Sequence, residues 1–343
     1  MVTLGALPCA RSSRQRHLLS QEDTMQVRQA VHDFISALEL TTAERTAASD
    51  QHKFLRDGLA SRLEIEPDHY PFLTGSYARS TAIRPLKDID LFCVLKRTPV
   101  LDPAISSPMD ALKTVREALE DQYSGKTADP QNRSVNISFS ITGIAYDVVP
   151  AFLDKGNSEI FWIPDLQAKT WIRSNPRIHE RLSVEANEAA GNELKPLTKA
   201  VKHWNRRQPD GARLRSFHIE VMIWDVLVAK PDNRLDGLIQ TFEGLASRVL
   251  LDTPDPAALG PHINQGMTDA EKTAAKTRLS QAAATLKEAR DLAQAGHTER
   301  AHYLLYGIFG DPYPEKGKEG RSIVTGVSAS LPSAPDGHGS RFG

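Results

Sequence analysis

The sequence is poor in cysteine and in long apolar runs, and both absences narrow what the protein can be. Its two cysteines, Cys9 and Cys93, are too few and too far apart for a disulfide framework or a zinc site, which favours a reducing compartment. No apolar run reaches the roughly 18 residues of a membrane-spanning helix. Residues 1–24 contain arginines but no apolar segment typical of a secretion signal. The sequence therefore predicts a cytoplasmic protein with no membrane contact.

A strong net charge is also missing. Lysine and arginine number 42 against 43 aspartates and glutamates, so the formal net charge is −1. Proteins that bind long nucleic acid usually carry a strongly basic surface, and this balance argues against such a partner. It still permits a local basic pocket for a small anion.

The pattern of apolar residues predicts an α+β protein of two lobes. Strands are expected at 88–95, 135–141 and 144–152, the last two forming a hairpin across Thr142-Gly143. Helices are expected at 27–38, at 41–63 after a Thr41–Glu44 capping box, and at 110–122. Further helices are expected at 185–207, 217–228, 236–250, 270–295 and 299–309. The predicted units are a loosely ordered N-terminus (1–24), an α+β lobe that includes the N-terminal helices (25–155), a helical lobe (156–316) and a flexible tail (317–343).

The segment 73–92, LTGSYARSTAIRPLKDIDLF, carries the clearest chemical signal. Gly75 lets the backbone approach a phosphate closely, and the hydroxyl of Ser76 can add a hydrogen bond. Asp88 and Asp90 follow on a predicted strand, where residues two apart share one face. A small-residue loop beside two such carboxylates is suited to a nucleoside triphosphate with Mg²⁺.

A third aspartate, Asp147, lies in the second strand of the predicted hairpin. Carboxylates within apolar strands are costly to bury unless they are paired or bind a metal. With Asp88 and Asp90, Asp147 would complete a set of oxygen ligands for Mg²⁺, with Mn²⁺ as an alternative ion. The competing interpretation is that these aspartates pair with Arg84 or Lys87 at a strand end.

A predicted helix within 185–207 places four cations on one face. Their spacing of i, i+4, i+7 and i+11 brings Lys195, Lys199, Lys202 and Arg206 together. A neighbouring apolar stripe, which would dock the helix, consists of Leu194, Leu197, Val201 and Trp204. Such a pattern usually indicates a basic face exposed to solvent. The alternative is that two or three of these charges bind a triphosphate in a cleft between the two predicted lobes.

Residues 75–85, followed by Asp88-Ile89-Asp90, resemble the signature of the DNA polymerase β-like nucleotidyltransferases. More narrowly, the chain is similar to the bacterial cGAS/DncV-like nucleotidyltransferases (CD-NTases) of CBASS antiphage systems. The resemblance runs from about residue 34 to 314 and includes the segment 305–313, LYGIFGDPY. It implies a polymerase β-like nucleotidyltransferase lobe with a mixed sheet, a C-terminal helical lobe and an active site in the cleft between them.

The same resemblance implies roles for individual residues. Asp88, Asp90 and Asp147 would be the catalytic metal ligands, and Gly75 and Ser76 would hold the triphosphate. Residues 197–205, LTKAVKHWN, resemble the helix whose basic residues bind the donor triphosphate, and Lys199 and Lys202 occupy the two basic positions. Residues 216–220, SFHIE, match the next family helix, so Ser216 and Phe217 are nucleotide-binding candidates and Phe217 would stack on a base.

The C-terminal segment ends in Gly-Ser-Arg-Phe-Gly, which resembles the tails of CD-NTases that an E1–E2-like ligase joins to other molecules. By that resemblance the carboxylate of Gly343 would be conjugated, and a JAB-type peptidase would release it. The alternative is a tail without a function of its own.

These observations lead to one main hypothesis and two alternatives. The main hypothesis is an enzyme that condenses nucleoside triphosphates, ATP among them, into a cyclic di- or trinucleotide that activates a downstream effector in antiphage defence. The first alternative is a nucleotidyltransferase that acts on RNA, a protein or a small molecule. The second is a non-catalytic nucleotide-binding adaptor.

Overall fold

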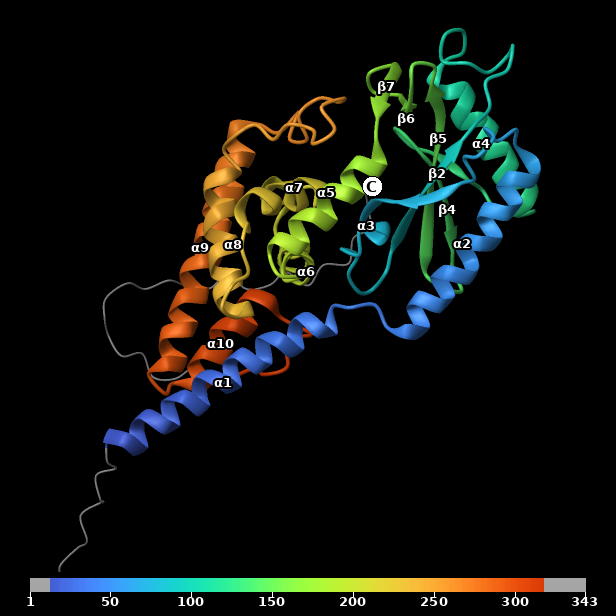
Figure 1. Ribbon diagram of the computed structural model, residues 1–343. Coiled ribbons are helices and arrows are strands. Elements are labelled where there is room, and N and C mark those ends of the chain that lie inside the picture. The colour runs from blue at the N-terminus through green and yellow to red at the C-terminus, as the bar shows by residue number, and fades with distance from the viewer. Residues whose placement is uncertain (1–12, 318–343) are drawn as a thin grey trace, which may run out of the picture.

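The structure is a computed structural model that describes residues 13–317, with side chains from residue 21 onward. Figure 1 shows a sheet lobe and a helical lobe side by side. The helices are α1 (Ser13–Ala37), α2 (Thr42–Arg62), α3 (Gly75–Ala78), α4 (Pro108–Gln122), α5 (Pro176–Ala189), α6 (Leu194–Arg206), α7 (Ser216–Val226), α8 (Arg234–Arg248), α9 (Asp269–Gln294) and α10 (Thr298–Phe309). The strands are β1 (Phe72–Thr74), β2 (Asp88–Val94), β3 (Asp129–Pro130), β4 (Val135–Phe139), β5 (Ile144–Asp154), β6 (Asn157–Asp165) and β7 (Thr170–Ser174). The predicted α+β class is confirmed.

One mixed sheet forms the frame of the first lobe. Its strand order is β1-β2-β5-β4-β3, and β6 continues from the end of β5 to pair with β7. The central strands β2 and β5 are parallel, whereas the predicted hairpin of β4 and β5 is antiparallel. Strands β6 and β7 extend the sheet to Ser174, beyond the predicted lobe boundary at residue 155. The sequence reasoning missed them because the apolar residues of β6 form a run instead of alternating.

The sheet buries one face against α2 and α4 (Figure 1). Alternate residues of β2, namely Ile89, Leu91 and Cys93, point into this core, and burial raises the pKa of the Cys93 thiol to about 12. The predicted capping box begins α2: Thr41 Oγ1 accepts from the Glu44 backbone N–H at 3.1 Å, and Glu44 accepts from the Thr41 N–H at 2.8 Å. The other residues of β2 are left on the opposite face.

Helix α1 packs in the helical lobe, although its sequence position suggested the first lobe. Its apolar face shares one core with α6, α8, α9 and α10, and Figure 1 shows it running along that lobe. This face comprises Val27, Ala30, Val31, Phe34 and Ile35. A periodic apolar face identifies a helix but not its partner. The helix begins at Ser13, so residues 13–24 are helical where loose order was predicted.

The predicted helix at 185–207 is in fact two helices. The helix is interrupted between α5 and α6, where Gly191 and Asn192 adopt positive φ angles of 61° and 67°. A single glycine within an apolar periodic pattern is tolerated in many helices, so the pattern indicates this interruption only weakly. The apolar stripe of α6 is buried as predicted. In the described part of the chain, no helix is both long and apolar enough to span a membrane.

Candidate active site

A row of polar side chains crosses the sheet on the face opposite the α2/α4 core. Thr74 of β1, Asp90 of β2, Asp147 of β5 and Asn136 of β4 are successive register partners. Asp88 precedes Asp90 by two residues on the same strand and therefore shares its face. The structure thus brings together the three aspartates that the sequence singled out.

Hydrogen bonds from β4 orient Asp147. Asn136 Nδ2 donates to Asp147 Oδ1 at 3.0 Å, and Ser134 Oγ donates to the same oxygen at 3.3 Å. Burial raises the pKa of Asp147, and the charge of Asp88 adds to this rise, while the two hydrogen bonds oppose it. The carboxylate is therefore fixed in position and crowded by a like charge.

Asp90 is the most perturbed carboxylate of the row. Burial raises its pKa to about 6, and the charges of Asp147 and Asp88 contribute to the rise. The positive charges of Arg79 and Lys202 act in the opposite direction. Since Arg84 forms an ion pair with Glu44 at 2.9 Å, pairing of these aspartates with Arg84 is not what the structure shows.

The Gly-Ser segment lies directly over Asp90. Gly75 begins the short helix α3 with φ +68°, and a Cβ atom added there would overlap the Asp90 carboxylate. Glycine is therefore required twice, for its backbone angle and for its missing side chain. The Ser76 carbonyl accepts from the Thr81 and Ala82 N–H groups at 2.9 and 3.1 Å, which fixes the turn after α3.

Two of the four cations on the basic face of α6, Lys199 and Lys202, form ion pairs. Lys199 and Lys202 are both buried, and Lys199 Nζ donates to Glu39 Oε1 at 2.5 Å. Lys202 Nζ donates to the Thr81 carbonyl at 2.9 Å and to Glu220 Oε1 at 3.1 Å, which places it between the two lobes. The charge of Lys202 lowers the pKa of Asp90.

The outer cations of this face make no ion pair with any residue in the described range 13–317. Burial lowers the pKa of Lys195, and the charges of Glu180 and Glu220 oppose this, whereas that of Arg79 adds to it. Burial also lowers the pKa of the Arg206 guanidinium, which the Asp88 carboxylate opposes. Both side chains are therefore within electrostatic range of the site.

Ser216 and Phe217 begin α7 at the edge of the same region. Ser216 is exposed, and Phe217 is partly buried. The Arg79 guanidinium carbon lies 4.8 Å from the centre of the Phe217 ring, and the His179 ring centre lies at 4.9 Å. A base that stacks here would meet a ring already in contact with both side chains.

Arg79 and Glu220 have no role predicted from the sequence, yet they form an ion pair between the two lobes. Arg79 Nε donates to Glu220 Oε2 at 2.9 Å, and both residues are buried. A signal was available, because Glu220 interrupts the apolar run of α7 and a buried carboxylate needs a partner. Its partner is 141 residues away in the chain, which the sequence does not reveal.

No group of three or more acidic, histidine or cysteine side chains within the described residues is arranged to hold a metal ion by itself. The oxygen donors of the aspartate row nevertheless match the chemistry of Mg²⁺, which usually takes one or two protein carboxylates together with substrate phosphates and water. Burial, and then repulsion by neighbouring carboxylates, raises the pKa values of Asp90 and Asp147, and a divalent cation would relieve the repulsion. The residues therefore fit an ion that arrives with its nucleotide.

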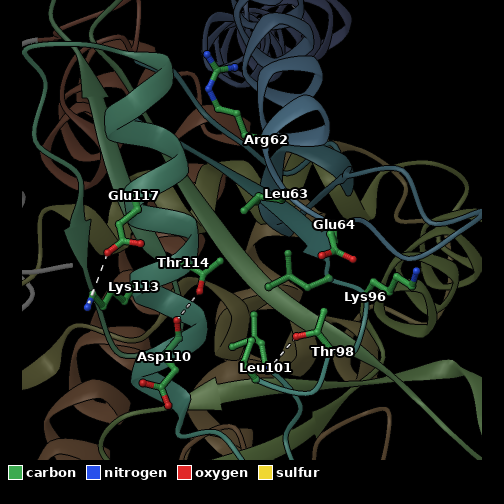
Figure 2. A pocket seen from close by; sticks show the side chains of 12 residues that line it. Arg62, Leu63, Glu64, Lys96, Thr98, Leu101, Asp110, Lys113, Thr114 and Glu117 are labelled. Carbon is green, nitrogen blue, oxygen red and sulfur yellow. Dashed lines mark hydrogen bonds and ion pairs between the residues drawn. The ribbon is translucent and has the colours of Figure 1, made fainter.

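A hollow of about 460 Å³ lies elsewhere in the sheet lobe, between α2, α4 and the end of β2 (Figure 2). Figure 2 shows that its lining includes side chains of both charges, and Lys113 pairs with Glu117 at 3.8 Å. None of the predicted site residues lines it. Its balanced charge does not suit a triphosphate.

Comparison with known proteins gives concordant results. Residues 25–187 match the family described as Second Messenger Oligonucleotide or Dinucleotide Synthetase domain. The chain is 27% identical over 348 residues to a cyclic AMP-AMP-AMP synthase from Acinetobacter sp., covering 94% of this chain and 96% of the relative. A cyclic AMP-AMP-GMP synthase from Enterobacter hormaechei is 25% identical over 238 residues, covering 52% of this chain and 61% of the relative.

Solved structures show the same fold. The chain matches E. coli MS115-1 CdnC with ATP at a TM-score of 0.69 and 18% identity, covering 83% of this chain and 98% of that one. It matches the Bradyrhizobium diazoefficiens CD-NTase CdnG in complex with GTP at a TM-score of 0.66 and 14% identity, covering 83% and 95%. The two-lobed architecture is thus shared over nearly the full length of both structures.

Proposed function

This chain belongs to the cGAS/DncV-like nucleotidyltransferases, and we infer that it is an enzyme that condenses nucleoside triphosphates into a cyclic di- or trinucleotide second messenger. ATP is proposed as one substrate, because the relatives include two synthases of adenine-containing cyclic trinucleotides. The proposal rests above all on the aspartate row, with Gly75 fitted against Asp90 and the charge of Lys202 lowering the pKa of the same carboxylate. A binding module would have no need of three crowded carboxylates on neighbouring strands.

We propose that Asp88, Asp90 and Asp147 hold Mg²⁺, or Mn²⁺ in its place, when a nucleotide is bound. Bound there, the metal would lower the pKa of an attacking 2′- or 3′-hydroxyl and neutralise the leaving pyrophosphate. Asn136 and Ser134 keep Asp147 in a fixed orientation throughout. The repulsion among the carboxylates in the free protein favours capture of the cation.

The nucleotide contacts follow from the surrounding residues. Gly75 and Ser76 would present the turn of α3 to the triphosphate, and Lys202 would add its charge from α6. Lys199 would contribute only after leaving Glu39, so we assign it the smaller share of phosphate binding. Ser216 and Phe217 would receive the base at the start of α7.

The test is incubation of the full-length protein with four labelled nucleoside triphosphates and Mg²⁺, followed by mass spectrometry. A cyclic product that resists phosphatase is expected. Label on RNA or protein without any small cyclic product would favour a different acceptor, and the absence of any transfer would favour the non-catalytic adaptor.

Replacing Gly75 with alanine should reduce product formation by about 100-fold, because the added methyl group displaces Asp90 by an ångström or so. Gly143 is a matched control, since its φ of +69° is nearly the same but nothing lies within 4 Å of the added Cβ. Gly143→Ala should therefore share the backbone strain and keep its activity. Equal initial rates for the two variants would show that the contact with Asp90 is unimportant.

The Mg²⁺ requirement should depend on pH. Because the pKa of Asp90 is raised to about 6, protons compete with the cation below that value. The Mg²⁺ concentration for half-maximal rate should stay constant above about pH 7 and rise toward tenfold per pH unit well below pH 6. Initial rates in Mg²⁺ titrations from pH 5 to 8 would measure this, and a constant half-saturation over that range would contradict it.

We further propose that the protein acts in the bacterial cytoplasm, where its nucleotide substrates are, and that its product reaches a downstream effector. The proposed conjugation of Gly343 by an E1–E2-like ligase, reversed by a JAB-type peptidase, concerns a residue outside the described part of the chain. Deletion of Gly343 would test it: the covalent adduct should be lost from cells that contain the ligase.

A further inference from the structure

Arg79 is a buried arginine whose terminal edge, formed by its two Nη groups, makes no hydrogen bond within the described part of the chain. It follows α3 directly, it is 8% exposed, and its Nε donates to Glu220 Oε2 at 2.9 Å. Neither of its terminal nitrogens donates to any residue in the described part of the chain, and neither is enclosed without a partner. The two Nη groups therefore offer N–H donors to something that the protein itself does not supply.

Two contacts hold the guanidinium in place while leaving that edge free. Its plane lies against the Phe217 ring, 4.8 Å from the ring centre, and Glu220 anchors its Nε. Glu220 is 1% exposed and also accepts from Lys202 Nζ at 3.1 Å. A planar group fixed at one edge and on one face presents its other edge in a defined direction.

Arg79 lies beside the aspartate row. It follows the short helix α3, and Gly75 at the start of that helix lies against the Asp90 carboxylate. Lys202 Nζ donates to the Thr81 carbonyl, two residues after Arg79, at 2.9 Å. Arg79 and Lys202 thus share a single carboxylate, Glu220, close to the Gly75 turn. Two cations with one counter-charge favour a bound anion, and a guanidinium edge matches two phosphate oxygens.

We propose that Arg79 is a further nucleotide-binding residue: its terminal nitrogens bind phosphate oxygens of the nucleoside triphosphate at the aspartate row, and Glu220 and Phe217 position it. The chemical class of this ligand rests on the proposed function. The arrangement also explains why the lobes meet here, since Arg79 belongs to the sheet lobe and Glu220 and Lys202 to the helical lobe. A triphosphate held by Arg79 and Lys202 would contact both lobes at once.

The test measures binding without catalysis, with the full-length protein, Mg²⁺ and α,β-methylene ATP in a calorimeter. Arg79→Met keeps the unbranched aliphatic part of the side chain and removes the charged guanidinium, and it should weaken binding at least tenfold. Arg56→Met is the matched control, because Arg56 also lies 4.8 Å from an aromatic ring centre, that of Tyr70, and beside a carboxylate, Asp57. Arg56 belongs to α2, on the core side of the sheet. The affinity of Arg56→Met for the analogue should stay within twofold of wild type.

Two further variants keep the proposal decidable if Arg79→Met does not fold. Arg79→Lys retains the charge and the partner Glu220, but replaces the fork by a point charge, and should bind threefold to tenfold more weakly. Glu220→Gln removes the negative charge that holds Arg79 Nε but keeps the N–H donors of Arg79. It should lower kcat more than it changes the affinity for the analogue. A structural role alone would leave the affinity of folded variants unchanged.

Binding by folded Arg79→Met or Arg79→Lys within twofold of wild type would overturn the inference. If the wild-type protein binds the analogue but forms no cyclic product, the proposed function fails while the role of Arg79 in binding stands or falls on these affinities. If it forms product and Arg79 variants bind normally, only the role of Arg79 fails. Failure of the wild type to bind the analogue at all would overturn the role of Arg79, whereas the proposed function would still be decided by product formation.

Discussion

Replacing Asp88 and Asp90 together with alanine should abolish cyclic product formation, with a loss of at least about 1,000-fold in initial rate. The two carboxylates share one face of β2, and Asp90 lies between Thr74 and Asp147 in the register of the sheet. Without them, Asp147 is the one remaining carboxylate of the row. We expect the variant to fold. Burial and the neighbouring carboxylates raise the pKa of Asp90, so removing both charges relieves a cost to the folded state.

The control is a variant with the same change of charge elsewhere in the lobe. Asp57 and Asp121 are exposed aspartates of α2 and the end of α4, and both pair with arginines at the surface. Their double alanine variant should keep its activity. Phosphatase-resistant product from labelled triphosphates is the measurement, and undiminished product from the Asp88/Asp90 variant would contradict the mechanism.

Replacing Glu220 with alanine should lower the free energy of unfolding by about 3–5 kcal/mol. Glu220 is 1% exposed and faces two cations, so its removal leaves Arg79 and Lys202 buried without a counter-charge. Burial by itself would raise the pKa of Glu220, but Lys202 and Arg79 more than offset this and lower it to about 2. The ion pairs therefore stabilise the fold fully above its ordinary pKa of 4.5, and this contribution is lost as the pH falls toward 2.

Denaturant unfolding at neutral and acidic pH would measure both effects. Glu117→Ala is the comparison, because Glu117 forms an exposed pair with Lys113 and its loss should cost no more than about 1 kcal/mol. The stability difference between wild type and Glu220→Ala should shrink between pH 4.5 and 2. A difference below 1 kcal/mol at neutral pH would mean that the two lobes are held together by apolar contacts instead.

Local patterns of the sequence predicted which residues share a face of a strand or helix. Asp88 and Asp90 share a face because strand side chains alternate, and this holds whatever lies around the strand. The glycine at position 75 and the capping box of α2 are likewise local requirements of the backbone. The apolar stripe of α6 predicted correctly which side of that helix is buried.

The sequence patterns did not predict which partners the side chains contact. Lys199 and Lys202 have the same pattern in the sequence, yet Lys199 pairs with Glu39, 160 residues away, and Lys202 joins Glu220 beside Asp90. In the same way the apolar face of α1 predicted a helix but not that it packs in the second lobe. Periodicity predicts whether a residue faces an apolar or a polar environment. It does not predict which residue becomes its partner.

The sequence by itself determined that this protein has a carboxylate-bearing strand beside a glycine turn and a docked basic helix, because period and spacing alone decide these. Only the tertiary structure decided which cations are neutralised, which remain free, and that Arg79 and Glu220 join the two lobes at the site. The physical reason is that ion pairing depends on distance in space, and the energy of a buried charge depends on every group that folding brings around it.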